Sequence, residues 1–288
     1  MIPPSFDYHA PRSIGEAVSL LANLGGEAKL LAGGHSLLPL MKLRFAQPAH
    51  LIDLGRIPDL RGIREEGGEL VIGAMTTQAD LLGSSVVRSK VPLLAEGAGT
   101  IADPQVRYKG TIGGDISHGD PGNDQPALMI ALDAAFVLTG PKAKRTVKAD
   151  GHFLGLYSTQ LAPDEILTQI RIPIPPAGSG WSYQKLKRKT GDFATAATAV
   201  LLQMKGTNVV KVAIALTNVG PTALRAKAAE DALLGRPINE SSLAEAARLA
   251  MSICAPTADQ RGDAEYKTAM CGEMTRRALQ AAAARAKS

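Results

Sequence analysis

The sequence predicts an α+β protein, in which a first part that mixes strands and helices precedes an antiparallel sheet followed by helices. The chain has 288 residues, the length of about two domains. Its hydrophobic fraction of 45% and mean hydropathy of +0.02 are typical of a substantial buried core. The stretch "PIPPAGSG" (173–180) is the best candidate for a linker. We therefore predict domains at 1–177 and 178–288, the first with two α/β subdomains at about 1–54 and 55–177.

The first part begins with a helix and a strand. Ser13 and Glu16 have the spacing of a capping box, and apolar residues follow at helical intervals. Gly25-Gly26 is expected to end this helix, and an apolar strand at 28–34 leads into a second glycine pair. Gly67-Gly68 predicts a hairpin turn. The further elements expected are strands at 50–54, 60–66, 69–75, 134–140 and 169–175, and helices at 77–82, 91–102 and 126–134, with a glycine-rich stretch at 110–115 and a loop at 117–124.

The second part has a simpler pattern. Three runs of strand-forming residues with short turns between them predict an antiparallel meander, and three alanine-rich amphipathic runs predict a helical bundle. The strands are expected at 181–188, 195–205 and 209–220, and the helices at 222–235, 241–253 and 263–286.

Composition excludes several classes of protein. The N-terminus lacks the basic and apolar regions of a signal peptide, and no apolar run approaches the roughly 20 residues of a membrane span. The cytoplasm is therefore the expected location. Cys254 and Cys271 form no CxxC motif, and the histidines show no metal-ligand spacing, so we expect neither a metal site nor an iron–sulfur cluster in this chain. Buried thiols are the favoured state of these two cysteines, and a disulfide between them is the alternative.

The net charge of +5 leaves nucleic acid open as a partner. However, aromatic residues make up only 4%, and "KLKRK" (185–189) is the one dense basic cluster. Such a short run is more often a solvated strand or loop, so we expect no nucleic-acid partner. A local site for an anionic ligand accounts for the same charge.

Two of the four glycine pairs differ from the others. Gly25-Gly26 and Gly67-Gly68 are each followed by Glu, which predicts solvent-exposed turns. Gly33-Gly34 and Gly113-Gly114 have apolar flanks instead. Their successive N–H groups could form two anion-binding nests that hold a pyrophosphate from both sides, and structural turns are the alternative. In the first case a Cβ at either pair would block the phosphate.

The hydroxyls next to these pairs, on Ser36 and Thr111, would add donors to such a site. Neither stretch is a GxGxxG motif or a P-loop. "AGGHS" (32–36) and "TIGGD" (111–115) resemble the FAD-pyrophosphate loops of vanillyl-alcohol-oxidase/PCMH-type flavoproteins. More narrowly, the whole chain resembles the flavin subunits of molybdenum hydroxylases, and within them the medium subunits of aerobic carbon monoxide dehydrogenases. The resemblance implies a PCMH-type FAD-binding domain followed by a domain with an antiparallel sheet and helices.

The resemblance also implies the cofactor contacts. They are Ala32, Gly33, Gly34, His35 and Ser36 on one side of the FAD diphosphate; Thr111, Ile112, Gly113, Gly114 and Asp115 on the other; Asp124 at ribose or ribityl hydroxyls; Leu167 and Phe193 against the ring; and Lys185 at the polar edge of the ring. From the residues alone, His35 could instead cap the following helix, Asp124 could be the N-cap of the next one, and Lys185 could be a solvated lysine. No catalytic residue is expected.

Asp115 departs from the Gly-Gly-Asn usual in this family. An amide both donates and accepts hydrogen bonds, whereas an ionised carboxylate only accepts and is repelled by phosphate. We therefore expect Asp115 to contact a hydroxyl or a backbone N–H.

The function implied by the resemblance is electron transfer within a complex. The flavin would receive electrons from two [2Fe–2S] clusters on a small subunit, which in turn receive them from a large molybdopterin subunit, and would pass them to an external acceptor such as a quinone. The complex would be a dimer of heterotrimers, a heterohexamer. A subunit of a hydroxylase for N-heterocycles or aldehydes and a stand-alone flavin oxidase are the alternatives.

Overall fold

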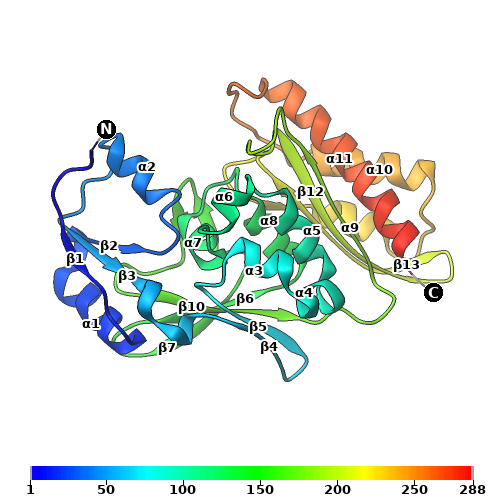
Figure 1. Ribbon diagram of the computed structural model, residues 1–288. Helices are drawn as coiled ribbons and strands as arrows, with labels where there is room; N and C mark the ends of the chain where they lie inside the picture. The colour runs from blue at the N-terminus through cyan, green and yellow to red at the C-terminus, as the bar shows by residue number, and fades with distance from the viewer. Residues whose placement is uncertain (1, 287–288) are drawn as a thin grey trace.

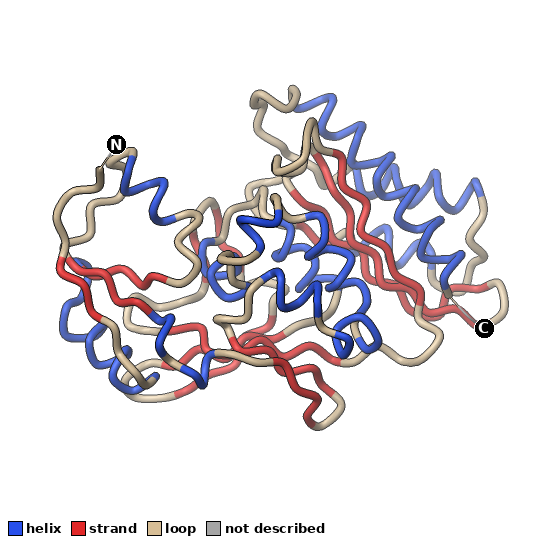
Figure 2. Tube along the Cα trace, viewed as in Figure 1, coloured by secondary structure: helices blue, strands red, loops and turns tan. Residues whose placement is uncertain are grey.

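The computed structural model describes residues 2–286, and Figure 2 shows its helices and strands. The strands are β1 (Asp7–His9), β2 (Ala28–Leu31), β3 (His50–Asp53), β4 (Ile63–Glu66), β5 (Glu69–Gly73), β6 (Ala135–Thr139), β7 (Lys144–Lys148), β8 (Phe153–Gly155), β9 (Ser158–Thr159), β10 (Ile166–Pro173), β11 (Gly180–Leu186), β12 (Ala196–Lys205), β13 (Asn208–Thr217) and β14 (Leu224–Arg225). The α-helices are α1 (Ile14–Leu24), α2 (Leu37–Lys42), α3 (Gln78–Gly83), α4 (Ser85–Lys90), α5 (Pro92–Thr100), α6 (Pro104–Arg107), α7 (Ile112–His118), α8 (Asp124–Ala131), α9 (Lys227–Leu233), α10 (Glu240–Met251) and α11 (Ala264–Arg285).

The strands form three sheets and a small hairpin. Their orders are β1-β3-β2, β4-β5-β10-β6-β7 and β11-β12-β13-β14, with β8-β9 as the hairpin. The first sheet is parallel, whereas the other two are antiparallel. In Figure 1 helices such as α3, α5 and α8 lie between the second sheet and the third, and α10 and α11 cover the outer face of the third. The α+β prediction is therefore confirmed.

Three apolar cores pack against the sheets. The largest core joins the second sheet and α5 and α8 to the inner face of the third sheet, where small side chains such as Ala197 and Ala215 allow close packing. The outer face of the third sheet packs on α9, α10 and α11. A smaller core lies between α1 and the first sheet. The largest core contains residues from both sides of the predicted linker. The division of the chain into two domains at residue 177 therefore stays a prediction.

Several local signals are confirmed. Ser13 caps α1 by accepting a hydrogen bond from the Glu16 N–H, while the Glu16 carboxylate accepts from the Arg12 N–H rather than from Ser13. Gly25 ends that helix, and Gly67 and Gly68 form the exposed turn between β4 and β5. The three predicted strands of the third sheet are present, and the two-residue β14 extends it.

Several predicted segments differ from the structure. The helix predicted at 222–235 begins only at Lys227, because Leu224 and Arg225 pair with β13 as strand β14. Residues 112–118 form helix α7 instead of a glycine loop, because the Thr111 side chain caps the helix and tertiary contacts hold it. Strand β10 begins at Ile166, earlier than predicted. A bulge between Leu167 and Gln169 interrupts its pairing with β6 and hides the start of the strand from a periodicity argument.

The structure also bears on the predictions about the cysteines, a metal site and membrane spans. Cys254 and Cys271 are both free thiols. Within residues 2–286 no group of three or more His, Cys, Asp and Glu side chains is arranged to hold a metal ion. Over the same residues, none of the helices combines the length and the apolar character needed to cross a membrane.

Gly33 and Gly113 are required by contacts within the protein itself. A Cβ on Gly33 would lie 2.3 Å from the Lys109 carbonyl oxygen, and a Cβ on Gly113 would lie 2.6 Å from the Ala74 carbonyl oxygen. Both distances are far below van der Waals contact with a backbone that cannot swing away. The expectation that a Cβ there would block phosphate is therefore replaced: the Cβ would first meet neighbouring backbone.

We predict that Gly33→Ala destabilises the chain by about 1–3 kcal/mol, the usual cost of overpacking. The matched control is Gly26→Ala, because a Cβ on Gly26 meets nothing within 4 Å. It should change the free energy of unfolding by no more than about 0.5 kcal/mol. Urea denaturation of both variants measures the difference. Equal stabilities would contradict the packing role of Gly33.

Candidate functional site

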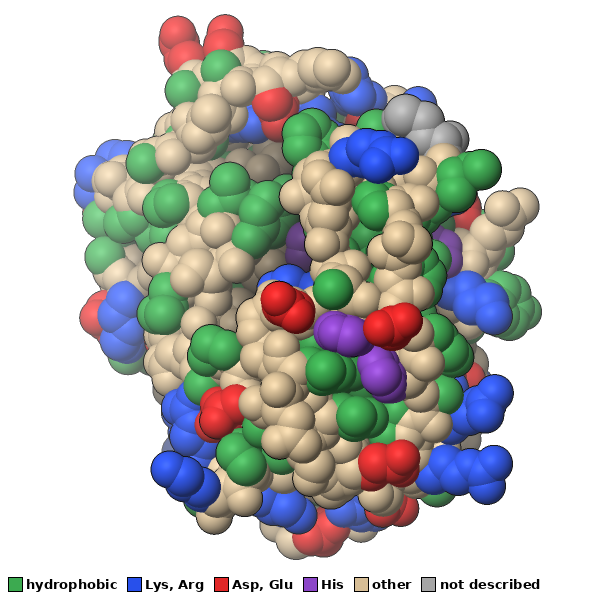
Figure 3. Space-filling model, turned by 90° about the vertical axis from the view of Figure 1, so that its left-hand side faces the viewer, with side chains coloured by type: hydrophobic (Ala, Val, Ile, Leu, Met, Phe, Trp, Pro, Cys, Tyr) green, Lys and Arg blue, Asp and Glu red, His purple; other side chains and the backbone are tan. Residues whose placement is uncertain are grey.

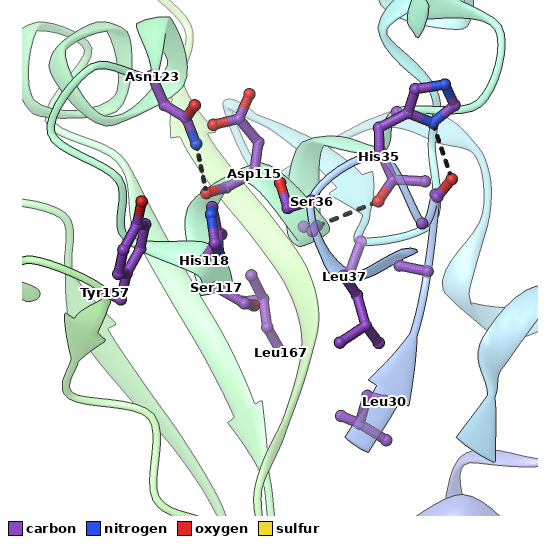
Figure 4. Close-up of a pocket in the computed structure, with 18 of the residues that line it drawn as sticks. Leu30, His35, Ser36, Leu37, Asp115, Ser117, His118, Asn123, Tyr157 and Leu167 are labelled. Carbon is purple, nitrogen blue, oxygen red and sulfur yellow. Dashed lines mark hydrogen bonds between the residues drawn. The ribbon is translucent and has the colours of Figure 1, made fainter. Parts of the chain in front are cut away.

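A cleft of about 900 Å³ collects the predicted site residues from several elements. Figure 3 shows that this side of the molecule is hollowed, and Figure 4 shows part of the lining. The predicted residues that line it are Ala32, Gly33, Gly34, His35, Ser36, Thr111, Gly113, Gly114, Asp115, Asp124, Leu167, Lys185 and Phe193. Ile112 is the exception: its side chain belongs to the largest core, and its N–H donates to the Thr76 carbonyl.

The first glycine loop, residues 32–36, presents unsatisfied backbone donors. Among the described residues, no backbone acceptor pairs with the N–H groups of Gly33 through Ser36. Gly34 has φ +77°, a conformation that favours glycine. The Ser36 hydroxyl makes no capping bond to α2, so it too is available to a ligand. His35 does not cap that helix: its Nδ1 lies 3.0 Å from the Gly33 carbonyl oxygen (Figure 4).

The second glycine stretch is built differently. The N–H of Gly113 donates to the Ala74 carbonyl at 2.9 Å, and the N–H of Gly114 donates to the Thr111 Oγ1 at 3.1 Å. The N–H of Asp115 donates to the Thr111 carbonyl. Because these donors are already paired, the two-nest prediction is corrected: only the first loop presents a run of free N–H groups.

Asp124 and Lys185 form a buried ion pair across the cleft floor. Their side chains are only 4% and 2% exposed, and Lys185 Nζ lies 2.6 Å from Asp124 Oδ2. The Tyr183 hydroxyl donates to Asp124 Oδ1 at 2.5 Å. Burial, reinforced by the Asp124 charge, raises the pKa of Tyr183 well above its ordinary value, so this phenol stays a donor. Lys185 is therefore not a solvated lysine, and Asp124 is not the N-cap of α8, which is Asn123.

Phe193 is held at the cleft by charged neighbours. The guanidinium of Arg261 lies 5.5 Å from the centre of the Phe193 ring. Arg261 also donates to the adjacent Asp192 at 2.7 Å, and Arg188 donates to the same carboxylate at 2.9 Å. These hydrogen bonds and charges lower the pKa of Asp192 to about 2 against the opposing effect of its burial. Phe193 itself is 45% exposed and lines the cleft.

Sequence reasoning missed several lining residues. Gln78 is 2% exposed, and its Nε2 has no hydrogen-bond partner among the described residues, although its Oε1 accepts from Gln125. Tyr157 has φ +55° and stacks on His118, with ring centres 4.7 Å apart. Nothing in the local sequence marks these side chains, because their place in the cleft depends on contacts between distant segments.

The residues present fit FAD. The free N–H run of the first loop suits a diphosphate. Leu167 offers an apolar surface to a ring, and the carboxylate of Asp124 keeps lone pairs beyond its two bonds to accept from sugar hydroxyls. Two buried polar atoms of the lining, Gln78 Nε2 and Asp115 Oδ1, have no hydrogen-bond partner among the described residues. Such atoms fit a cleft that holds a polar ligand.

Fold and cleft together define the class of protein. Residues 4–175 match the family described as the FAD binding domain in molybdopterin dehydrogenase. Residues 181–282 match the CO dehydrogenase flavoprotein C-terminal domain. The chain therefore belongs to the family of FAD-binding flavoprotein subunits of molybdopterin dehydrogenases, which are oxidoreductases.

Two relatives and one solved structure are similar to this chain along nearly its whole length. The chain is 61% identical to the carbon monoxide dehydrogenase medium chain of Hydrogenophaga pseudoflava, over 99% of both chains. It is 55% identical to the medium chain of Afipia carboxidovorans, over 100% of both. A solved structure of the Hydrogenophaga pseudoflava carbon monoxide dehydrogenase that lacks the Mo-pyranopterin moiety superimposes with a TM-score of 0.99, at 63% identity and full coverage of both chains.

We predict that Lys185→Met destabilises the chain by about 3–5 kcal/mol, because it leaves the Asp124 carboxylate buried and unpaired. Lys187→Met is the matched control: Lys187 lies two residues further on and has no carboxylate partner within residues 2–286. It should change stability by less than about 1 kcal/mol. Urea denaturation of the two variants measures both effects. A loss no larger for Lys185 than for Lys187 would show that the pair contributes little.

Proposed function

We propose that this chain is the FAD-binding subunit of a carbon monoxide dehydrogenase, and that it transfers electrons without activating the primary substrate. The observation that carries the proposal is the cleft, which is lined by a run of free N–H groups, by Leu167 and by the paired Asp124. The chain that forms this cleft is 61% identical along its length to a carbon monoxide dehydrogenase medium chain. In this proposal the [2Fe–2S] clusters and the molybdopterin lie on a small and a large partner subunit, in a dimer of heterotrimers.

The residues of this chain would bind and orient the cofactor. The N–H groups of residues 33–36 and the Ser36 hydroxyl would hold the diphosphate, and Asp124 would accept from ribose or ribityl hydroxyls. Leu167 and Phe193 would contact the ring. The charge of Lys185 is compensated by Asp124, so it would act on the ring edge as a hydrogen-bond donor more than as a free cation.

FAD, when bound, supplies the ability to take up and release electrons one or two at a time. Among the described carboxylates of the cleft, Glu165 and Asp192 are paired with arginines and Asp124 with Lys185, so none of these three is free for substrate acid–base chemistry. The protein's task in this proposal is therefore binding, orientation and electrostatic tuning. The final acceptor would be external, such as a quinone, and the site of action the cytoplasm.

The test is to purify the protein from its native host under mild conditions and to record the visible spectrum and the subunit masses. We expect a flavin band, iron–sulfur absorption and two co-purifying chains. Carbon monoxide should bleach the spectrum, because the flavin and clusters become reduced, whereas an N-heterocycle or an aldehyde should not.

Two outcomes would contradict the proposal. Bleaching by a heterocycle or aldehyde but not by carbon monoxide would place the chain in a different molybdenum hydroxylase. A yellow chain without partners would indicate a stand-alone oxidase.

A further inference from the structure

Asp115 differs from every other carboxylate that lines the cleft. Four carboxylates contribute to the lining, and three of them have a cationic partner. The three pairs are Asp124 with Lys185 at 2.6 Å, Glu165 with Arg145 at 2.7 Å, and Asp192 with Arg261 at 2.7 Å. Within residues 2–286, Asp115 has no cation within ion-pair distance. The carboxyl group on the second glycine stretch is thus the one without a counterion.

One oxygen of the Asp115 carboxyl group also lacks a hydrogen-bond donor, although the residue as a whole is only partly buried. Its Oδ1 is shielded from solvent and has no partner among the described residues. The amide of Asn123 donates to the backbone carbonyl of Asp115 at 3.4 Å, as Figure 4 shows. An ionised carboxylate buried without hydrogen bonds is costly, whereas a neutral carboxylic acid is much less so.

The surrounding charges act in the same direction. Burial raises the pKa of Asp115 well above its ordinary value, and the negative charges of Asp124 and Asp120 raise it further. Lys185 and a hydrogen bond from Asn123 oppose this effect more weakly, and the Lys185 ammonium group is already bonded to Asp124.

No other group facing Asp115 supplies a compensating charge at neutral pH. His118 lies on the same helix, and burial lowers its pKa from the ordinary value, so its ring is neutral. The elements β9 and β10 bring Thr159 and Leu167 to the cleft, and neither titrates. His35, on the first glycine loop, is an exposed side chain bonded to its own backbone.

We infer that Asp115 is held as a neutral carboxylic acid whose O–H donates a hydrogen bond to a diphosphate oxygen of the cofactor. This inference rests on the proposed function, since it needs FAD in the cleft. A neutral acid has a donor, as the Asn of the usual Gly-Gly-Asn pattern does, and it is not repelled by phosphate. Asp115 would then be a positioning residue that makes cofactor binding depend on pH.

The sign of that dependence follows from linkage. The cofactor would bind the protonated form better, so affinity is full below the pKa of Asp115 and falls as pH rises through it. Above that pKa, the dissociation constant of FAD should rise by up to about tenfold per pH unit. Asp115→Asn keeps a neutral donor and cannot ionise, so its dissociation constant should stay flat over the same range.

The experiment uses the complex purified with its partner subunits, stripped of flavin and titrated with FAD across a pH series. Asp115→Asn is the conservative variant, and Asp115→Ala, which has no donor, should bind FAD more weakly than Asp115→Asn at every pH. Asp120→Asn removes one repelling charge while keeping the oxygen that accepts from the Gly122 N–H. It should move the pH transition to lower pH.

A second readout does not need FAD. The infrared difference spectrum between flavin-free wild type and Asp115→Asn should contain the carbonyl stretch of a protonated carboxylic acid. If wild type and Asp115→Asn share one pH profile, or if affinity in wild type rises with pH, the inference is overturned. If wild type binds no FAD at any pH, the proposed function fails, and the infrared band then decides the protonation state by itself.

Discussion

The close approach of backbone segments around Gly33 and Gly113 is the constraint on which the cleft depends. Gly33 abuts the Lys109–Gly110 backbone, which leads into α7, and Gly113 in α7 abuts Ala74 at the end of β5. The first sheet, the second sheet and α7 are thereby brought together with no side chain between them. Only glycine permits this separation. The N–H groups of the first loop are left without backbone acceptors, so the same packing that closes the fold also leaves donors suited to the proposed anionic cofactor.

The third sheet is joined to this arrangement by polar contacts in an otherwise apolar interface. Asp124 belongs to α8, whereas Lys185 and Tyr183 belong to β11, so the ion pair and the phenol hydrogen bond cross from one part of the chain to the other. Buried ion pairs contribute little net stability compared with apolar packing, because desolvation offsets the Coulomb energy. They do fix relative position, since a displaced sheet would leave a charge unpaired. Lys185 on β11, and Phe193 in the loop between β11 and β12, thus reach the cleft from a sheet whose position on α8 is fixed.

Much of this fold was predictable from local sequence, and the reasons are particular. Ser13 and Gly25 act through their own backbone neighbours, and the main strands of the third sheet are strand-forming runs separated by short turns. Helix α7 was not predictable, because its two glycines disfavour a helix and only the Thr111 cap and the contact with Ala74 impose it. The pairing of Asp124 with Lys185 spans 61 residues and has no local signal. The glycine motifs themselves were found from sequence, but which of their N–H groups are free depends on distant acceptors.

The charge distribution of the cleft explains why dipoles, and not a cluster of cations, would bind the cofactor. Lys29 and Lys185 are the lysines in the lining, and Lys185 is neutralised by Asp124. A diphosphate would therefore be met mainly by N–H groups, which bring no net charge to the ring system some distance away. A cationic phosphate site would instead raise the electrostatic potential over the whole cleft and bias the flavin towards its reduced, anionic form. An electron-transfer subunit has to release electrons as well as accept them. In the proposed role, a cleft in which most charges are paired internally would satisfy both requirements, because it would bind an anion without strongly favouring one oxidation state of the ring.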